Sequence, residues 1–172
     1  MTARIEPVAE LLFAPEDAVP MSTDSSTIVP WTEAVERLAA AGKVWLATSR
    51  ASGQPHVQPV LAVWLDVALY VSTRPGSVKG RNLARDGRCA VTVSTEQLDL
   101  VVEGVARPTR ADRMPAVVAA FEAAYQWRFT LSDGKVLDSS LPGSPEYVFY
   151  EISPTTAFGY GLDGLTATRW RF

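Results

Sequence analysis

Three stretches of the chain carry apolar residues at helical spacing. They cover residues 31–41, 78–84 and 109–125. Trp31, Val35 and Leu38 recur at i, i+4 and i+7, which places them on one face of a helix. Thr109 can cap the third helix because Asp112 follows three residues later, the spacing of a capping box. The pattern therefore predicts three short helices.

Most of the remaining apolar residues stand in runs typical of strands. The runs cover residues 43–48, 56–65, 69–72, 88–95, 97–107, 147–152, 156–160 and 166–172. The first three runs predict a meander, with the second strand bent or edged by Pro59. Helices are too few for repeated βαβ units. We therefore expect a mainly β, α+β fold: a barrel with a few helices packed on its outside.

The chain divides into two parts of different character. Residues 1–29 contain the polar run 22–27, and only Leu11–Phe13 is apolar enough to dock. We interpret 1–29 as a flexible N-terminal arm with at most one anchored turn, or as an arm that reaches a partner subunit. Residues 30–172 form the folded domain.

Composition excludes several classes of protein. The chain has 172 residues, 47% of them hydrophobic, and a net charge of -3. This acidic balance disfavours nucleic-acid binding. Cys89 is the single cysteine, so no intrachain disulfide can form. No apolar run is long enough to span a membrane. Glu6 and Glu10 interrupt any signal-peptide pattern, and a cytoplasmic location follows as the expectation.

Two suggestive motifs carry little weight. Residues 159–164 match G-x-G-x-x-G but come too close to the C-terminus for a strand–helix dinucleotide unit, so we interpret them as a hairpin.

His56 is the only histidine, which rules out a multi-histidine metal site. No metal site is expected. His56 is either a proton donor near a cofactor or an ordinary strand residue, and no catalytic residue can be assigned.

The segment 72–83 contains the features of a phosphate site. A strand ends in hydroxyl residues, a Pro–Gly turn follows, and a helix then begins with Ser77 and Lys79. Helix N-termini, hydroxyls and ammonium groups all favour phosphate. The alternative is an ordinary capped helix with a solvated basic face.

Several runs, in this order and spacing, resemble the pyridoxamine 5'-phosphate oxidase-like superfamily, and most closely its flavin- and deazaflavin-dependent oxidoreductases. They are residues 45–50, 53–60, 69–73, 76–83, 101–106 and 168–172. The resemblance implies an FMN-binding split β-barrel that forms a homodimer with two cofactor sites between its subunits.

The same resemblance implies roles for individual residues. Val57, Gln58, Pro59 and Val60 would lie beside the flavin or deazaflavin ring, where backbone amides can polarise its pyrimidine edge. The phosphate would be held by Ser72, Thr73, Ser77 and Lys79, with Asn82 nearby.

The chain also departs from the oxidase proper. That enzyme has an arginine immediately before the helix lysine, whereas this chain has Val78, and its C-terminal substrate-binding pattern is missing. Oxidation of pyridoxamine phosphate is therefore not expected. Trp170, with Arg169 and Arg171, either closes the site or packs into the barrel with its arginines in water.

We expect an oxidoreductase that transfers a hydride between bound F420 or FMN and a small organic acceptor. The oligoglutamate tail of F420 would need exposed cations, and the candidates are Lys43, Arg50, Arg74, Arg81 and Arg85. The alternatives are a non-catalytic flavin-binding or haem-binding barrel, with His56 as the axial ligand, and a structural dimer without a cofactor.

Overall fold

The computed structural model describes residues 6–13 and 24–172, and its main feature is an antiparallel sheet. The helices are η1 (Ser25–Thr27, a 3₁₀ turn), α1 (Trp31–Ala40), α2 (Val78–Arg85) and α3 (Met114–Tyr125). The strands are β1 (Val8–Leu11), β2 (Val44–Ser49), β3 (Pro55–Val60), β4 (Ala62–Leu65), β5 (Ala68–Thr73), β6 (Arg88–Ser94), β7 (Leu98–Pro108), β8 (Thr130–Ser132), β9 (Lys135–Leu137), β10 (Glu146–Gly161) and β11 (Ala167–Arg171).

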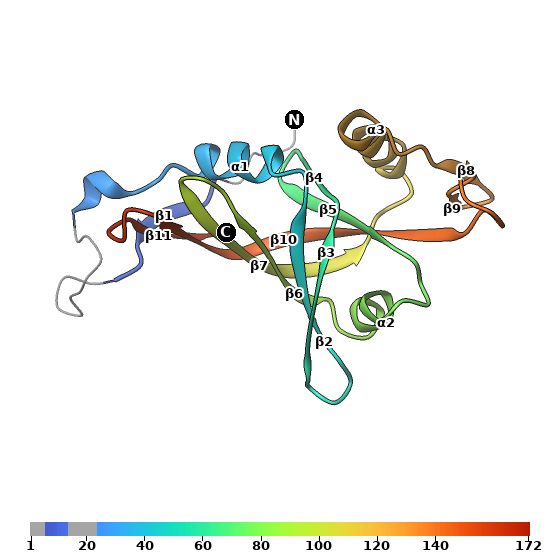
Figure 1. The fold of residues 1–172 in the computed structure, drawn as a ribbon, viewed down its shortest axis with the longest axis horizontal. Helices are drawn as coiled ribbons and strands as arrows, with labels where there is room; N and C mark the ends of the chain where they lie inside the picture. Colours follow the sequence, from blue (N-terminus) through green and yellow to red (C-terminus); the bar gives the residue numbers. More distant parts are fainter. Residues whose placement is uncertain (1–5, 14–23) are drawn as a thin grey trace.

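The sheet curls into a split barrel, as the sequence predicted. Its main path runs β1-β11-β10-β7-β6-β2-β3. The long strand β10 also pairs with β5, which pairs in turn with β4. Because β3 and β4 are not hydrogen-bonded to each other, the barrel stays open between them. In Figure 1, β1 and β11 lie at one end of the molecule, and α3 lies with the β8–β9 hairpin at the other.

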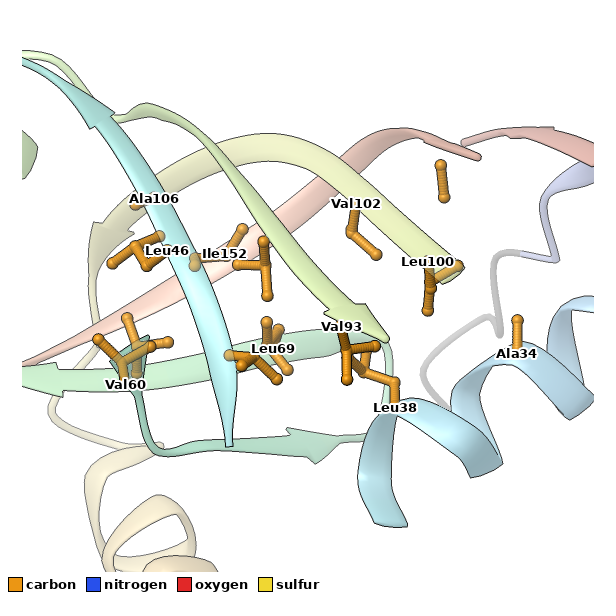
Figure 2. Packing of buried hydrophobic residues seen from close by; sticks show 14 of the residues in the cluster. Ala34, Leu38, Leu46, Val60, Leu69, Val93, Leu100, Val102, Ala106 and Ile152 are labelled. Atoms are coloured by element: carbon orange, nitrogen blue, oxygen red, sulfur yellow. The ribbon is translucent and has the colours of Figure 1, made fainter. Parts of the chain in front are cut away.

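The barrel interior is filled by the inward-facing residues of these strands. Figure 2 shows Leu46, Val60, Leu69 and Ile152 pointing into a common interior, which Leu38 of α1 covers at one end. All five are buried. Burying a side chain of this size contributes roughly 1.5–3 kcal/mol, so this cluster holds the barrel together.

A second core joins α3 to the outer side of β5 and β10. Phe121 and Phe149 are fully buried there, with ring centroids 5.1 Å apart in an edge-to-face arrangement. Trp127 and Phe129 continue this cluster toward the β8–β9 hairpin. The cluster therefore fixes the position of the chain between α3 and β10.

The expected strand over residues 56–65 is two strands in the structure. β3 pairs with β2, whereas β4 pairs with β5, and the chain changes partner at Leu61. The expected three-strand meander is therefore wrong. Residues 59–65 are all apolar, so the sequence gives no sign of this break: both halves are strands and only their partners differ.

The expected cap of α3 is also wrong. The helix begins at Met114 after Arg113, with Pro115 in its first turn. Thr109 instead continues from β7: its amide donates to the carbonyl of Phe149, and its buried hydroxyl has no hydrogen-bond partner within residues 6–13 and 24–172. Proline suits the first turn of a helix because its missing N–H is not needed there.

Three further differences concern strands. Residues 147–160 form one strand, with a bulge between Pro154 and Thr156, rather than two. Within the turn-rich stretch, β8 and β9 form a hairpin. In the stretch expected as an arm, Val8–Leu11 pairs with β11; the rest of that expectation lies partly outside the described residues.

Other local expectations are confirmed. Helices α1 and α2 lie where the apolar spacing placed them. Gly159–Gly164 spans the end of β10 and the turn into β11, so it is a hairpin rather than a dinucleotide loop. No helix in the described part of the chain has the length and apolar character needed to cross a membrane.

Candidate functional site

A pocket of about 290 Å³ opens where β3, β5 and the start of α2 meet. It is lined by Pro59, Val60, Leu61, Ser72, Thr73, Arg74, Ser77, Lys79, Trp127 and Tyr147. Seven of these were named from the sequence: Pro59, Val60, Ser72, Thr73, Ser77 and Lys79 for the ring and phosphate, and Arg74 for the F420 tail. The structure therefore brings the expected phosphate-binding residues and part of the expected ring-binding strand into one pocket.

The turn between β5 and α2 shapes one wall of this pocket. Ser77 caps α2, with its hydroxyl accepting from the amide of Gly80 at 3.0 Å. Its own amide donates to the carbonyl of Arg74. A Cβ on Gly80 would lie 2.5 Å from that same carbonyl oxygen, so only glycine allows the turn to fold this tightly against the helix.

Two hydroxyl groups lie together at the mouth of this turn. The Oγ1 of Thr73 and the Oγ of Ser77 are 2.8 Å apart. Beside them, the first amides of α2 point out of the helix without intrahelical acceptors. Hydroxyl protons and helix N-terminal amides are the neutral groups that bind phosphate oxygens, so this corner is suited to an anion.

Lys79 adds a positive charge to the same wall. It is partly buried, and burial lowers the pKa of its ammonium group. Within residues 6–13 and 24–172, no carboxylate forms an ion pair with it. A desolvated ammonium without a partner is unfavourable by itself, and an anion in the pocket would relieve that cost.

Asn82 lies outside the pocket and holds α2 in place. It is buried, and its amide donates to the Oγ1 of Thr48 at 2.9 Å. Thr48 in turn donates to the carbonyl of His56 at 3.3 Å. This chain of hydrogen bonds fixes α2 against β2 and β3, which positions Lys79 over the pocket.

The other expected site residues lie elsewhere. Val57 and Gln58 precede the pocket residues on β3, and Val57 is 54% exposed on the outer face of the sheet. Trp170 is fully buried against Trp31, and its indole donates to the carbonyl of Val29. For the ring this is the packing alternative that the sequence left open, and it leaves the ring no surface for a ligand. Arg169 and Arg171, however, form ion pairs with Glu10 of β1.

The aromatic side of the pocket could not be predicted from the sequence. Trp127 and Tyr147 come from the loop after α3 and from the start of β10. Their ring centroids are 5.2 Å apart with the planes at 86°. No spacing rule joins these two positions to Lys79, because only the packing of α3 brings them together.

His56 and Cys89 do not line this pocket. The His56 Nδ1 lies 3.3 Å from an Arg50 nitrogen, and its buried Nε2 has no hydrogen-bond partner in the part of the chain that the structure describes. Burial raises the pKa of the Cys89 thiol to about 12, which makes it unreactive. No cluster of three or more metal-ligating side chains occurs in the described residues.

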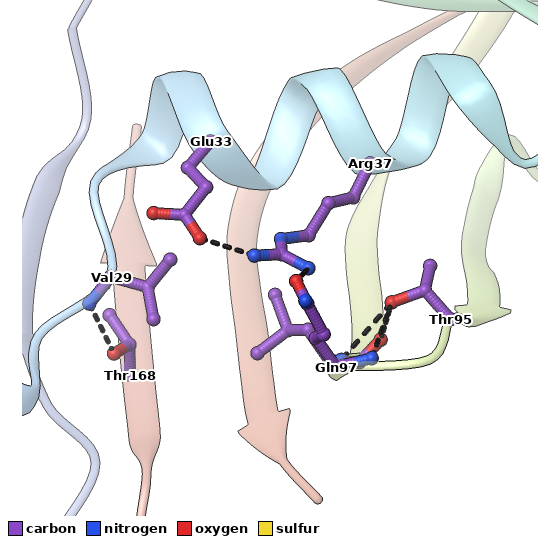
Figure 3. A network of polar contacts seen from close by, with 7 residues as sticks. Val29, Glu33, Arg37, Thr95, Gln97 and Thr168 are labelled. Atoms are coloured by element: carbon purple, nitrogen blue, oxygen red, sulfur yellow. Dashed lines mark hydrogen bonds and ion pairs between the residues drawn. The ribbon is translucent and has the colours of Figure 1, made fainter.

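A second hollow, of about 340 Å³, lies between α1 and the β6–β7 and β10–β11 turns. Figure 3 shows that Arg37 of α1 bonds to Glu33 of the same helix and to Gln97 in the β6–β7 turn. Nearby, the amide of Val29 donates to Thr168. Arg37 therefore links α1 to the β6–β7 turn through Gln97.

Comparison with known proteins gives a family match and several similar structures. A family model described as pyridoxamine 5'-phosphate oxidase matches residues 31–160. A search of curated proteins found no match.

Three solved structures illustrate the likeness. A haem-binding protein from Mycobacterium smegmatis is 18% identical with a TM-score of 0.62; the match covers 84% of this chain but only 56% of that protein. An F420 reductase is 20% identical, with a TM-score of 0.54 and coverage of 71% and 93%. A pyridoxamine 5'-phosphate oxidase-related FMN-binding protein from Nostoc punctiforme is 19% identical, with a TM-score of 0.59 and coverage of 83% and 89%. At these identities the structures support the shared fold.

Proposed function

This chain belongs to the pyridoxamine 5'-phosphate oxidase family, and from that premise we propose that it binds FMN or the deazaflavin F420 and transfers a hydride to a small organic acceptor. The observation that carries the proposal is the partly buried Lys79, which faces the pocket without an acidic partner among the described residues. A cofactor phosphate is an anion of the right size and charge for that position.

Different residues around Lys79 would bind different parts of the cofactor. The hydroxyls of Thr73 and Ser77 and the first amides of α2 would donate hydrogen bonds to the phosphate oxygens. Pro59 and Val60 offer an apolar wall from β3. One edge of β3 has no neighbouring strand among the described residues, so backbone groups there are available to a ring.

A flavin or deazaflavin would supply the hydride-carrying ring when bound. The protein's own contribution is then to anchor the phosphate, orient the ring and exclude water. These roles need no acid–base pair, and none is recognisable among the described residues that line the pocket. Val78 stands where the oxidase proper has an arginine, so we do not propose pyridoxamine phosphate as the substrate.

We also propose that the protein works as a homodimer. Trp45 and Val57 are about half exposed on the outer face of β2 and β3. The strand register places Val57 opposite Ala47, and Ala47 beside Ala90 of β6. This apolar face begins next to the pocket-lining Pro59, so a second subunit packed there would border the pocket.

Haem binding is the weaker alternative. The only histidine is His56, and it lies outside the pocket with its Nε2 enclosed. The pocket therefore offers no histidine as an axial ligand.

The deciding experiment is equilibrium binding of FMN and of F420 to the purified protein, followed by fluorescence at matched salt. Saturable binding of one of them supports the proposal and identifies the cofactor; reduction of acceptors can then be screened with that cofactor in its reduced form. Binding without reduction of any acceptor would favour a carrier protein, and binding of neither would refute the cofactor assignment.

A further inference from the structure

The pocket has two chemically different sides. Lys79 and the hydroxyls of Thr73 and Ser77 form the polar side, and Trp127 and Tyr147 form the aromatic side. Both aromatic rings are partly exposed. A ligand that fills this pocket must therefore carry an anionic group next to a part that packs against an indole ring.

The indole of Trp127 is fixed by a buried carboxylate. Its Nε1 donates to the Oδ2 of Asp138 at 2.9 Å. Asp138 is 1% exposed, and its other oxygen accepts from the amide and hydroxyl of Ser140. Desolvation raises the pKa of the Asp138 carboxyl, but the hydrogen bonds from Ser140 and Trp127 outweigh it, so the pKa is lower than usual.

A buried carboxylate without a cation is costly, and here hydrogen-bond donors alone offset the cost. No ion pair involves Asp138 in the described parts of the chain. Losing the Trp127 donor would leave one carboxylate oxygen without its partner. The indole therefore has one strongly preferred position.

Packing restrains the same ring from the sides. The Trp127 ring centroid lies 4.5 Å from that of Phe129 and 6.4 Å from that of Phe121. Asp138 also holds its own loop, because its amide donates to the carbonyl of Pro145 at 3.0 Å. The aromatic wall is thus preformed before any ligand arrives, which lowers the entropic cost of binding.

We propose that Trp127 contacts the planar ring of the phosphorylated ligand and determines which rings the pocket accepts, and that Asp138 is the positioning residue that holds the indole in place. This inference rests on the proposed flavin or deazaflavin binding. It adds a specificity residue from a segment of the chain that the family resemblance did not point to.

The first test separates the ring contact from the phosphate contact. FMN and riboflavin share the ring but differ in the phosphate; F420 and its phosphate-free deazaflavin chromophore serve if the protein prefers F420. We expect Trp127→Ala to weaken the binding of both members of the pair by roughly tenfold, the range for loss of an aromatic stacking partner. Lys79→Ala should weaken only the phosphorylated member.

The second test concerns Asp138. Asp138→Ala should weaken binding about as much as Trp127→Ala, and combining the two should add little, because both act through the same ring. Asp138→Asn keeps an oxygen that can accept from the indole, and it should restore most of the affinity. Rescue by asparagine and non-additivity are results that a merely structural role would not produce.

Asp163→Ala is the matched control. Asp163 also accepts three hydrogen bonds, from the amides of Leu165 and Thr166 and from the Thr166 hydroxyl, but it lies in the β10–β11 turn away from this pocket. It should lower the melting temperature without changing ligand affinity.

The outcomes distinguish the two proposals. If the unaltered protein binds FMN or F420 and Trp127→Ala binds it equally well, the inference fails while the proposed function stands. If Asp138→Ala and Trp127→Ala are fully additive, Asp138 is not the positioning residue. If the unaltered protein binds neither cofactor, the proposed function fails and this inference fails with it.

Discussion

At the scale of single residues, Lys79 is the side chain on which the proposed cofactor site most depends. Lys79→Ala should weaken FMN binding by about 1.5–3 kcal/mol, the value of a charge-assisted hydrogen bond, or roughly 10- to 150-fold in affinity. Titration followed by flavin fluorescence measures this. Lys43→Ala is the control, because Lys43 is exposed and does not line the pocket. Equal affinity in a folded Lys79→Ala protein would refute the phosphate assignment.

The pKa of Lys79 leads to a pH prediction. Burial lowers this pKa in the free protein, whereas a bound phosphate stabilises the charged ammonium and raises it. Affinity for FMN should therefore be full at neutral pH and fall as the pH rises through the lowered pKa of the free protein. The cofactor phosphate is already doubly charged above neutral pH, so titration of the phosphate does not cause this loss of affinity. Titrations between neutral and alkaline pH should show this loss in the unaltered protein and a flat profile in Lys79→Ala.

At the scale of elements, the close packing of α2 against its preceding turn sets the geometry of the proposed phosphate site, which is formed by Thr73, Ser77 and the first amides of α2. A Cβ on Gly80 would lie 2.5 Å from the Arg74 carbonyl oxygen and 2.9 Å from that of Pro75. Gly80→Ala should therefore shift the start of the helix, cost about 1–3 kcal/mol of stability, and weaken FMN binding. Thermal unfolding and titration together measure both effects.

Gly76→Ala is the control for that change. Gly76 lies in the same turn, but a Cβ there meets nothing within 4 Å and its φ is not positive. It should leave stability and affinity within experimental error of the unaltered protein. If both substitutions behave alike, the tight contact at Gly80 does not shape the site.

The elements also show what could be predicted from the sequence. The apolar spacing around Trp31 and Leu38 was sufficient for α1, because an amphipathic helix carries its own signal. The break at Leu61 was not predicted because the residues on both sides of it are apolar and differ only in their strand partner. The pairing of β1 with β11 was not predicted because these strands are distant in the chain. Among site residues, Ser77 and Lys79 follow from a local turn-and-helix motif. Trp127 does not, because tertiary packing alone brings it to the pocket.

At the scale of the whole molecule, the exposed apolar face of β2 and β3 is the basis for the proposed dimer. A specific dimer buries about 800 Å² or more on each subunit with an apolar centre, and Val57 lies within that face. Val57→Arg would place an unpaired charge at this centre. We expect light scattering coupled to gel filtration to give about twice the 18.6 kDa chain mass for the unaltered protein and the single mass for Val57→Arg.

Leu162→Arg is the control for the predicted loss of the dimer. Leu162 is 59% exposed, comparable to Val57 at 54%, but it lies in the β10–β11 turn rather than on β3. It should leave the dimer intact. The dimer face adjoins the pocket at Pro59, so Val57→Arg should also weaken FMN binding, although Val57 does not line the pocket of a single subunit. A Val57→Arg protein that stays dimeric would place the interface elsewhere, and a monomer with full FMN affinity would show that one subunit forms the whole site.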